Sequence, residues 1–332
     1  WPVIYANYGA GCEVANPSAD DGPADLDSGH GTHVTGSVAG DGSRSDSRFR
    51  GLGYGAGVVF QAVEQYTTWT NTPFPCIDPA GYYLTGIPDD VRDLLDEAYQ
   101  NGARIHNDSW GGGAFGVYDS TSQQFDDFVY RHPDMTIVVS AGNSGVDGDL
   151  DGYVDENSIT SPATSKNLIS MGASESERST GGYQYTWGEA WPMDYWADPT
   201  KSDKVSDSRE ELAAFSSRGP LQDGRIKPDV VAPGTNIISA RSSQITSNGW
   251  GPYDAYYMFM GGTSMASPMG TGTAALVHDY YVKGQGHLNP SAALIKATLI
   301  NTAVDIQGYG NPGEEAGQPI PNHHEGWGRI DL

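Results

Sequence analysis

The sequence predicts an α/β fold of three layers, in which a mostly parallel central sheet lies between two layers of helices. Short apolar runs of strand length alternate along the chain with segments in which apolar residues recur at helical spacing. The chain has 332 residues, of which 37% are hydrophobic, which is enough for a sizeable buried core. Because no internal repeat and no interdomain linker is recognisable, we expect a single domain over residues 1–332.

The first third of the chain predicts two helices and one strand. A loop rich in Asp, Pro, Ser and Gly covers residues 12–29, and helix-compatible spacing follows over 30–39. Residues 57–63 are apolar and predict a buried strand, whereas 66–86 show no clear period and predict a long loop. Residues 89–101 predict a second helix, because their apolar residues share one face and a glycine follows.

The middle of the chain predicts a strand, a helix and two further strands. A short strand over 104–109 ends in consecutive glycines, and a helix with inward aromatic residues follows over 119–131. The clearest strand covers 136–140, and another covers 168–173. Strands separated by helices in this way are typical of a parallel sheet.

The last part of the chain begins with a polar, aromatic-containing insertion over 174–211 to which no element is assigned. Short strands are expected over 229–232 and 236–240. A helix is expected directly after Ser264, and a final helix over 290–303 begins with a proline, which suits a first helical turn.

Charge is strongly unbalanced, with 42 acidic against 18 basic residues and a net charge of −24. Such a surface repels phosphate groups, so the composition argues against a nucleic-acid partner. An acidic surplus is typical of solubility in an extracellular or salty medium and of cation binding. No apolar run reaches the length of a membrane-spanning helix.

The two cysteines, Cys12 and Cys76, are too few for a disulfide scaffold. In a secreted protein they would pair, and closing so long a loop stabilises by about 3–5 kcal/mol in the chain-entropy description. Two unpaired buried thiols are the alternative. The chain begins without Met on a strand-like apolar run, from which we expect a processed or truncated chain.

A serine between small residues, Ser264, lies in the stretch Gly-Thr-Ser-Met-Ala-Ser-Pro at residues 262–268. The preceding glycines permit a sharp turn, and the apolar run that follows places Ser264 near the first turn of a helix. Free N–H groups and the positive end of the helix dipole there favour developing negative charge. The stretch is therefore either a plain helix cap or the setting of a nucleophilic serine.

Two histidines, His30 and His33, lie in Gly-His-Gly-Thr-His-Val-Thr-Gly at residues 29–36. Small neighbours leave the His30 ring accessible, whereas His33 points into the apolar face of the helix. A lone histidine is commonly structural, and we expect that role for one of the two. An accessible imidazole can take a proton from a serine and return it to a leaving group, because its pKa lies near neutrality.

Two loops follow predicted strands, where the site of a parallel sheet is expected. Asn143, in Ser-Ala-Gly-Asn-Ser-Gly at 140–145, is either a turn residue or an amide that donates to an oxyanion beside the Ser264 N–H. The stretch Ser-Trp-Gly-Gly-Gly at 109–113 is either a glycine-rich turn or bare backbone that pairs with an extended peptide.

Together these stretches resemble the subtilisin-like serine proteases of peptidase family S8. The runs His-Gly-Thr-His-Val, Ala-Gly-Asn-Ser-Gly and Gly-Thr-Ser-Met-Ala-Ser-Pro occur in the order typical of that family. Four further runs, at 102–106, 215–220, 223–229 and 326–329, resemble its large alkaline branch of the KP-43 type. The resemblance covers about residues 28–330 and implies a subtilisin-like catalytic domain. Relatives of that branch often carry a C-terminal β-domain.

The resemblance implies that Ser264 is the nucleophile, His30 the general base and acid, and Asn143 a donor of the oxyanion hole. Residues beside the specificity pocket would hold the substrate backbone: Ser109, Trp110, Gly111, Gly112, Ala141 and Gly142.

The catalytic aspartate of the family has no counterpart in this chain. That residue lies in an Asp-Thr/Ser-Gly motif at the end of an early strand, some tens of residues before the histidine. Asp27, Ser28 and Gly29 match the motif in sequence, but Asp27 is too close to His30 along the chain to contact its ring. Asp20 and Asp25 are no better supported. Either an upstream segment carries the acid, so that this chain lacks its first core strand and is nearly inactive alone, or the site is degenerate.

The acidic stretch over 147–155, directly after the Asn143 loop, has the spacing of a calcium loop. Oxygens at alternate positions surround a hard cation, and Gly152 makes the turn. The ligands would be the carboxylates of four residues and one carbonyl: Asp147, Asp149, Asp151, Tyr153 (carbonyl) and Asp155. A bound Ca²⁺ would hold Asn143 in place, and a solvated acidic loop is the alternative.

The sequence thus favours a secreted serine endopeptidase that cleaves extended polypeptides through an acyl-enzyme on Ser264. A catalytically weak binding or assembly protein of the same fold is the alternative, supported by the missing aspartate. A calcium-binding adhesion module would explain the acidic loop but not the other motifs.

Overall fold

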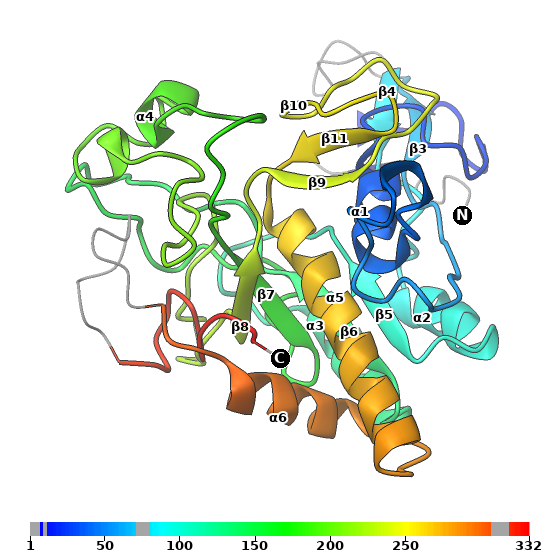
Figure 1. Cartoon of the computed structure of the whole chain (residues 1–332). Helices are drawn as coiled ribbons and strands as arrows, with labels where there is room; N and C mark the ends of the chain where they lie inside the picture. The colour runs from blue at the N-terminus through cyan, green and yellow to red at the C-terminus, as the bar shows by residue number, and fades with distance from the viewer. Residues whose placement is uncertain (1–6, 9–11, 71–79, 307–318, 332) are drawn as a thin grey trace.

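The computed structural model describes residues 7–8, 12–70, 80–306 and 319–331. Four parallel strands form the central sheet in the order β5-β6-β7-β8 (Figure 1). They are β5 (Ile105–Asp108), β6 (Thr136–Ser140), β7 (Ile169–Ser174) and β8 (Val230–Pro233). Parallel pairing brings their carboxyl ends to one edge of the sheet, as the alternation of strands and helices predicts.

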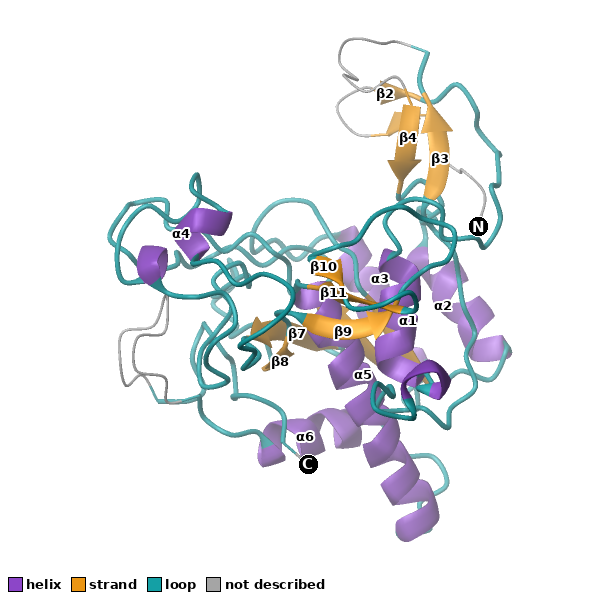
Figure 2. Ribbon diagram, turned by 45° about the horizontal axis from the view of Figure 1, so that its top comes forward, coloured by secondary structure: helices purple, strands orange, loops and turns teal. Residues whose placement is uncertain are grey.

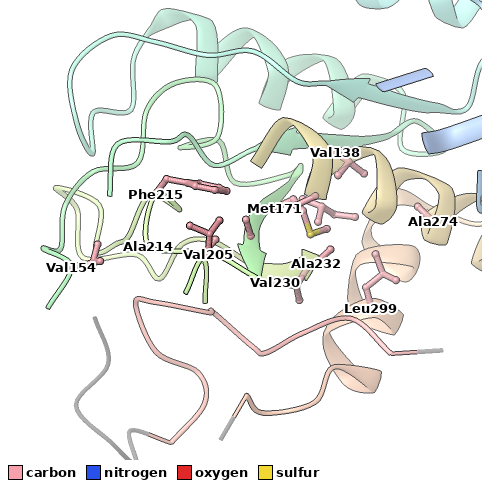
Figure 3. Close-up of a cluster of buried hydrophobic side chains, with 14 of the residues drawn as sticks. Val138, Val154, Met171, Val205, Ala214, Phe215, Val230, Ala232, Ala274 and Leu299 are labelled. Atoms are coloured by element: carbon pink, nitrogen blue, oxygen red, sulfur yellow. The ribbon is translucent and has the colours of Figure 1, made fainter. Parts of the chain in front are cut away.

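Helices cover both faces of this sheet, which confirms the predicted α/β class. The helices α5 (Thr263–Asp279) and α6 (Ala292–Thr302) pack on one face, where Val138 and Met171 meet Ala274 (Figure 3). On the other face lie α2 (Val91–Gln100) and α3 (Ser120–Arg131), which contact the alternate side chains of β6. Every residue of β6 is buried because both of its faces are covered.

Antiparallel strands lie outside the central sheet. A three-stranded sheet joins β9 (Ile237–Ala240), β10 (Gly251–Pro252) and β11 (Tyr257–Met260) in the order β10-β11-β9. The helix α1 (His30–Ala39) packs between β9 and α5. Two small antiparallel pairs are β1 (Asn7–Tyr8) with β2 (Cys12–Glu13), and β3 (Gln65–Thr68) with β4 (Ala80–Tyr83). Figure 2 shows β3 and β4 projecting from the body of the protein.

Short helical turns complete the secondary structure: η1 (Ser43–Ser45), α4 (Trp187–Ala190), η2 (Thr200–Ser202) and η3 (Tyr280–Gly284). Both α4 and η2 belong to the insertion over 174–211. None of the described helices combines the length and the apolar character that a membrane crossing requires.

Two sequence-based predictions are wrong. Residues 57–63 are not in a strand, and Val58, Val59 and Phe60 are 53%, 41% and 48% exposed. The expected loop over 66–86 instead contains parts of β3 and β4. Those strands are rich in polar and tyrosine residues, so hydrophobicity alone does not reveal them. Cys12 is disulfide-bonded, and Cys76, the only other cysteine of the chain, lies outside the described residues.

Glycines allow α5 to lie directly against its neighbours. A Cβ at Gly270 would collide with the side chain of Met171 on the sheet, and one at Gly272 would lie 2.7 Å from the Cβ of Leu52. Glycine within a helix costs about 1 kcal/mol relative to alanine. Here that cost is offset by close packing of the helix that begins beside Ser264.

Candidate active site

The residues singled out by the motifs meet at one cavity of about 1190 Å³. It lies where the first turns of α1 and α5 approach the carboxyl ends of β5 and β6. His30, Asn143 and Ser264 all line it. Five of the six predicted substrate-binding residues also line it: Ser109, Trp110, Gly111, Gly112 and Gly142. Ala141 instead lies fully buried in the core beneath the cavity.

Ser264 is the second residue of α5 and makes a reciprocal pair of hydrogen bonds with Ser109. The Ser264 hydroxyl donates to the Ser109 carbonyl at 3.1 Å, and the Ser109 hydroxyl donates to the Ser264 carbonyl at 3.0 Å. Within a regular helix the Ser264 carbonyl would accept from residue 268. Because Pro268 has no N–H, that carbonyl is free to accept from Ser109 instead.

A hydrogen-bonded chain extends from this pair into the core. Asn107 of β5 donates from Nδ2 to the Ser109 hydroxyl at 2.9 Å. Its Oδ1 accepts from Ser267 at 2.9 Å and from Thr271 at 2.8 Å, one turn apart on α5. Sequence reasoning missed Asn107. The available signal is its spacing of two residues from Ser109 within a strand, which puts both side chains on one face.

Asn143 is held by its side-chain oxygen, and its amide nitrogen has no hydrogen-bond acceptor among the described residues. Its Oδ1 accepts from the Thr263 N–H at 2.8 Å and from the Thr263 hydroxyl at 2.9 Å. Because the N–H of Thr263 requires an acceptor, Nδ2 is the remaining end of this exposed side chain. Gly142, with φ of 112°, makes the turn, and its N–H donates to Thr263 Oγ1 at 3.3 Å. A donor is thereby available beside the start of α5.

His30 begins α1 and is half-buried at the cavity wall. Burial lowers the pKa of His30, and the nearby charge of Asp25 partly offsets this shift. The ring is therefore neutral at pH 7 and able to accept a proton. Asp25 uses its two carboxylate oxygens to accept the N–H groups of Gly29 and Thr32, each at 2.9 Å. No side chain in the described ranges is hydrogen-bonded to the His30 ring.

His33 has the structural role that is expected of one of the two histidines. It is fully buried, and its Nε2 donates to the carbonyls of Ile237 at 3.1 Å and Met258 at 3.2 Å. Burial lowers the pKa of His33 to about 4, so this ring also stays neutral.

Three of the five predicted calcium ligands gather in the acidic loop. Carboxylate oxygens of Asp147, Asp149 and Asp151 lie within 4.8 Å of one another. Asp147 is 2% exposed, and its Oδ1 has no hydrogen-bond partner among the described residues. Asp155 Oδ2 accepts the Gly148 N–H at 2.8 Å, which closes the loop. A buried carboxylate oxygen without a donor fits a cation ligand, so this loop can hold a hard divalent ion.

A serine at a helix start, a neutral histidine and an amide group on one cavity are the kinds of groups that serine hydrolases use. The chain belongs to the subtilase family, whose model matches residues 5–328. It is therefore a member of a family of serine peptidases.

Curated relatives of this family cover most of the chain. The serine protease/ABC transporter B family protein tagD of Dictyostelium discoideum is 30% identical over 378 aligned residues, which cover 92% of this chain and 20% of that protein. Serine protease AprX of Bacillus subtilis is 29% identical over 265 residues, covering 76% of this chain and 48% of AprX. This chain thus spans about a fifth to about half of these proteins.

Solved structures support the fold. The CspB protease of Clostridium perfringens has a TM-score of 0.60 at 17% identity, covering 92% of this chain and 78% of that one. Sphericase has a TM-score of 0.58 at 22% identity, covering 96% and 82%. These matches establish a subtilisin-like fold with a parallel central sheet. The proteins named here do not single out the KP-43-type branch.

Proposed function

We propose that this chain is the catalytic part of a secreted serine endopeptidase that cleaves extended polypeptides through an acyl-enzyme on Ser264. The observation that carries this proposal is the meeting of His30, Asn143 and Ser264 at one cavity. The acidic surface and the disulfide-bonded Cys12 support an extracellular setting.

The chemistry follows from the positions of these groups. Neutral His30 takes the hydroxyl proton of Ser264, whose Oγ attacks the carbonyl carbon of the scissile bond. The oxyanion accepts hydrogen bonds from Asn143 Nδ2 and from the Ser264 N–H in the first turn of α5. Protonated His30 gives its proton to the leaving amine, and water then hydrolyses the ester by the same route. Before attack, the Ser264 hydroxyl turns away from the Ser109 carbonyl to which it now donates.

The substrate would bind as an added strand along the exposed glycines 111–113. The backbone is tightly placed there, because the Gly112 N–H donates to the Ser161 carbonyl at 2.8 Å. A Cβ on Gly111 would lie 2.8 Å from that same carbonyl oxygen. Glycine at this position therefore allows the rim to lie directly against the backbone at Ser161.

We further propose that a strand from outside residues 1–332 supplies the orienting aspartate. On one side of the cavity lie the exposed Val58, Val59 and Phe60, in a segment without a described strand partner. On the other side lies β5, whose outer edge has no strand partner in the described part of the chain. The Gln61 side chain bridges the gap, with its Oε1 3.2 Å from His106 Nε2, and it would turn aside when a strand enters. The exposed apolar side chains on one side and the unpaired edge of β5 on the other would both be covered by one apolar strand.

The position of His30 supports the same proposal. A strand parallel to β5 would end beside Ser109, at the edge of the sheet where His30 lines the cavity. A carboxylate at that end would reach the ring, which has no described hydrogen-bond partner. Loss of the orienting acid costs about 10⁴-fold in turnover in serine proteases, a scale measured in other enzymes.

The test compares the isolated 332-residue chain with the full-length gene product. A fluorophosphonate should label Ser264 in the full-length protein, and Ser264→Ala should abolish labelling. Turnover of the isolated chain should be lower by about 10⁴-fold. Full activity of the isolated chain would refute the external aspartate while leaving the peptidase proposal intact. A full-length protein that neither labels nor hydrolyses peptides would favour the catalytically weak binding protein, to which the missing acid also points.

We also propose that the acidic loop binds Ca²⁺ and thereby fixes the segment that carries Asn143. EDTA should lower the melting temperature, and added Ca²⁺ should restore it. In Asp149→Asn with Asp151→Asn, that response should be reduced. An unchanged response in the double variant would contradict a site in this loop. Membership of the KP-43-type branch and a following C-terminal β-domain remain proposals that rest on the four sequence runs.

A further inference from the structure

Three carboxylates meet at the neck of the insertion over 174–211, away from the site described above. Glu175 directly follows β7, Asp203 follows η2, and Glu211 lies where the insertion returns to the core. One oxygen of each lies within 4.8 Å of the other two. Glu175 is fully buried, Glu211 is 9% exposed and Asp203 is half-buried.

Among the described residues, the hydrogen-bond donors that face this cluster are neutral, and a fourth carboxylate, that of Asp207, lies nearby. Trp187 Nε1 lies 3.1 Å from Glu175 Oε1 and 3.2 Å from Asp203 Oδ2, and the Asp207 N–H donates to Glu175 Oε2 at 3.2 Å. None of the ion pairs among the described residues includes any of the three carboxylates. Glu211 Oε2 is buried and has no partner among the described residues.

Such a cluster requires neutralisation, because a buried carboxylate without a donor or counter-charge is costly. Burial and mutual repulsion raise the pKa of Glu175 well above its usual value. Burial and the nearby charge of Asp207 raise the pKa of Asp203 to about 7, and burial with the charges of Asp203 and Asp207 raises the pKa of Glu211 to about 8. The close approach of the three carboxylates and the buried, unpartnered Glu211 Oε2 therefore point to a cation between them.

We propose that Glu175, Asp203 and Glu211 form a second calcium site, which fastens the insertion at its neck. All three ligands are hard oxygens, as Ca²⁺ prefers. At Ca–O distances of 2.3–2.6 Å, oxygens on opposite sides of the ion are separated by about 4.6–5.2 Å, which accommodates the observed spacing. Mg²⁺, with bonds of about 2.0–2.1 Å, demands a tighter shell.

The backbone explains what the ion would accomplish. The two ends of the insertion already pair, because the Glu175 N–H donates to the Glu211 carbonyl at 2.8 Å and the Ala213 N–H donates to the Ala173 carbonyl at 3.0 Å. Asp203 comes from the interior of the insertion. An ion shared with Glu175 and Glu211 would tie that interior to both ends.

The insertion in turn supports the segment after Asn143. Tyr195 donates its hydroxyl to the Gly145 carbonyl at 2.9 Å, and Thr200 donates to the Gly152 carbonyl at 2.6 Å. Removing the ion at the neck would therefore loosen the supports of the neighbouring acidic loop as well.

Terbium luminescence gives a specific test, because the Trp187 indole contacts two of the ligands and can sensitise a bound Tb³⁺. Ca²⁺-depleted protein is titrated with Tb³⁺ while tryptophan is excited, and Ca²⁺ is then added as competitor. We expect a strong signal that Ca²⁺ displaces, and a loss of at least tenfold in Tb³⁺ affinity in Glu211→Gln. The matched control, Asp149→Asn with Asp151→Asn, should keep this signal and lose one bound Ca²⁺ by elemental analysis.

A measurement on the unaltered protein covers the case in which Glu211→Gln does not fold. Infrared spectra of the Ca²⁺-depleted protein at pH 6 should show protonated carboxyl bands that disappear when Ca²⁺ is added. If those bands persist at saturating Ca²⁺, or if Glu211→Gln binds Tb³⁺ and Ca²⁺ like the unaltered protein, the cluster is neutralised by protons and the proposal is wrong. A response to Mg²⁺ equal to that to Ca²⁺ would also overturn the assignment.

Discussion

Replacing Ser109 by alanine tests whether the strand end positions the nucleophile. The change removes two hydrogen bonds, one accepted from Asn107 and one donated to the Ser264 carbonyl. Each contributes about 0.5–1.5 kcal/mol, and the Ser264 carbonyl cannot recover a helical partner because Pro268 has no N–H. We expect the free energy of unfolding to fall by about 2 kcal/mol.

The effect on reactivity should exceed a general loss of stability. If about 1.4 kcal/mol of the loss appears in the barrier, labelling of Ser264 by a fluorophosphonate should slow about tenfold. The matched control is Ser267→Ala, which removes a bond to the same Asn107 but touches neither atom of the Ser109–Ser264 pair. It should destabilise by about 1 kcal/mol and leave the labelling rate within about twofold. Equal labelling rates in the two variants would refute the positioning role of Ser109.

Three further predictions concern stability and are measured by urea unfolding. Burial and the nearby Arg218 lower the pKa of His324 to about 3, so the unfolded chain binds more protons between the ordinary value of 6.5 and 3. His324 should therefore contribute a loss of about 2 kcal/mol of stability from pH 6.5 to 5, measured as the difference between the unaltered protein and His324→Gln; an identical pH dependence in the two proteins would contradict this. Asp229→Asn leaves the buried ammonium of Lys227 without its counter-charge, since Lys227 Nζ lies 2.7 Å from Asp229 and its side chain is 3% exposed. The free energy of unfolding should fall by about 3 kcal/mol. In the control Asp223→Asn, at the more exposed pair with Arg225, it should fall by less than about 1 kcal/mol. Gly270→Ala should destabilise the protein by about 1–3 kcal/mol, because the new methyl group forces Met171 aside. Gly284→Ala, where a Cβ would have its nearest contact at 3.4 Å, should leave stability unchanged. Equal effects of the two substitutions would argue against close packing of α5.

The sequence predicted those elements whose local pattern and tertiary environment agree. The helices α2 and α3 have a clear apolar face and an aspartate at the N-cap, Asp90 and Asp119, whose side chains accept N–H groups of the first turn. Strand β6 is apolar throughout because it is covered on both faces. The type and the approximate ends of such segments can therefore be predicted from their own residues.

The failures have a common physical cause, which is that strand formation depends on a partner. Residues 57–63 have the composition of a buried strand but no pairing strand in the described part of the chain. The polar strands β3 and β4 form because they pair with each other, which composition alone does not indicate.

The candidate site divides in the same way. Motif order located His30, Asn143 and Ser264, which the structure places on one cavity. The spacing of two residues between Asn107 and Ser109 is a local signal, but the bonds from α5 to Asn107 join distant segments and are not visible in the sequence. The meeting of Glu175, Asp203 and Glu211 likewise depends on the folded chain.

The helix α5 is the longest of the described helices, and it joins the start of the active site to the middle of the core. Its glycines leave no room for the helix to shift against Met171 or Leu52. Ser264 therefore lies at the start of a helix that is closely packed against the core, whereas the glycines at 111–113 form an exposed rim. Substrate preference can accordingly change through that rim during evolution while the reacting hydroxyl stays fixed. A substitution that changes how α5 packs against the core would alter both the stability of the fold and the rate of the reaction.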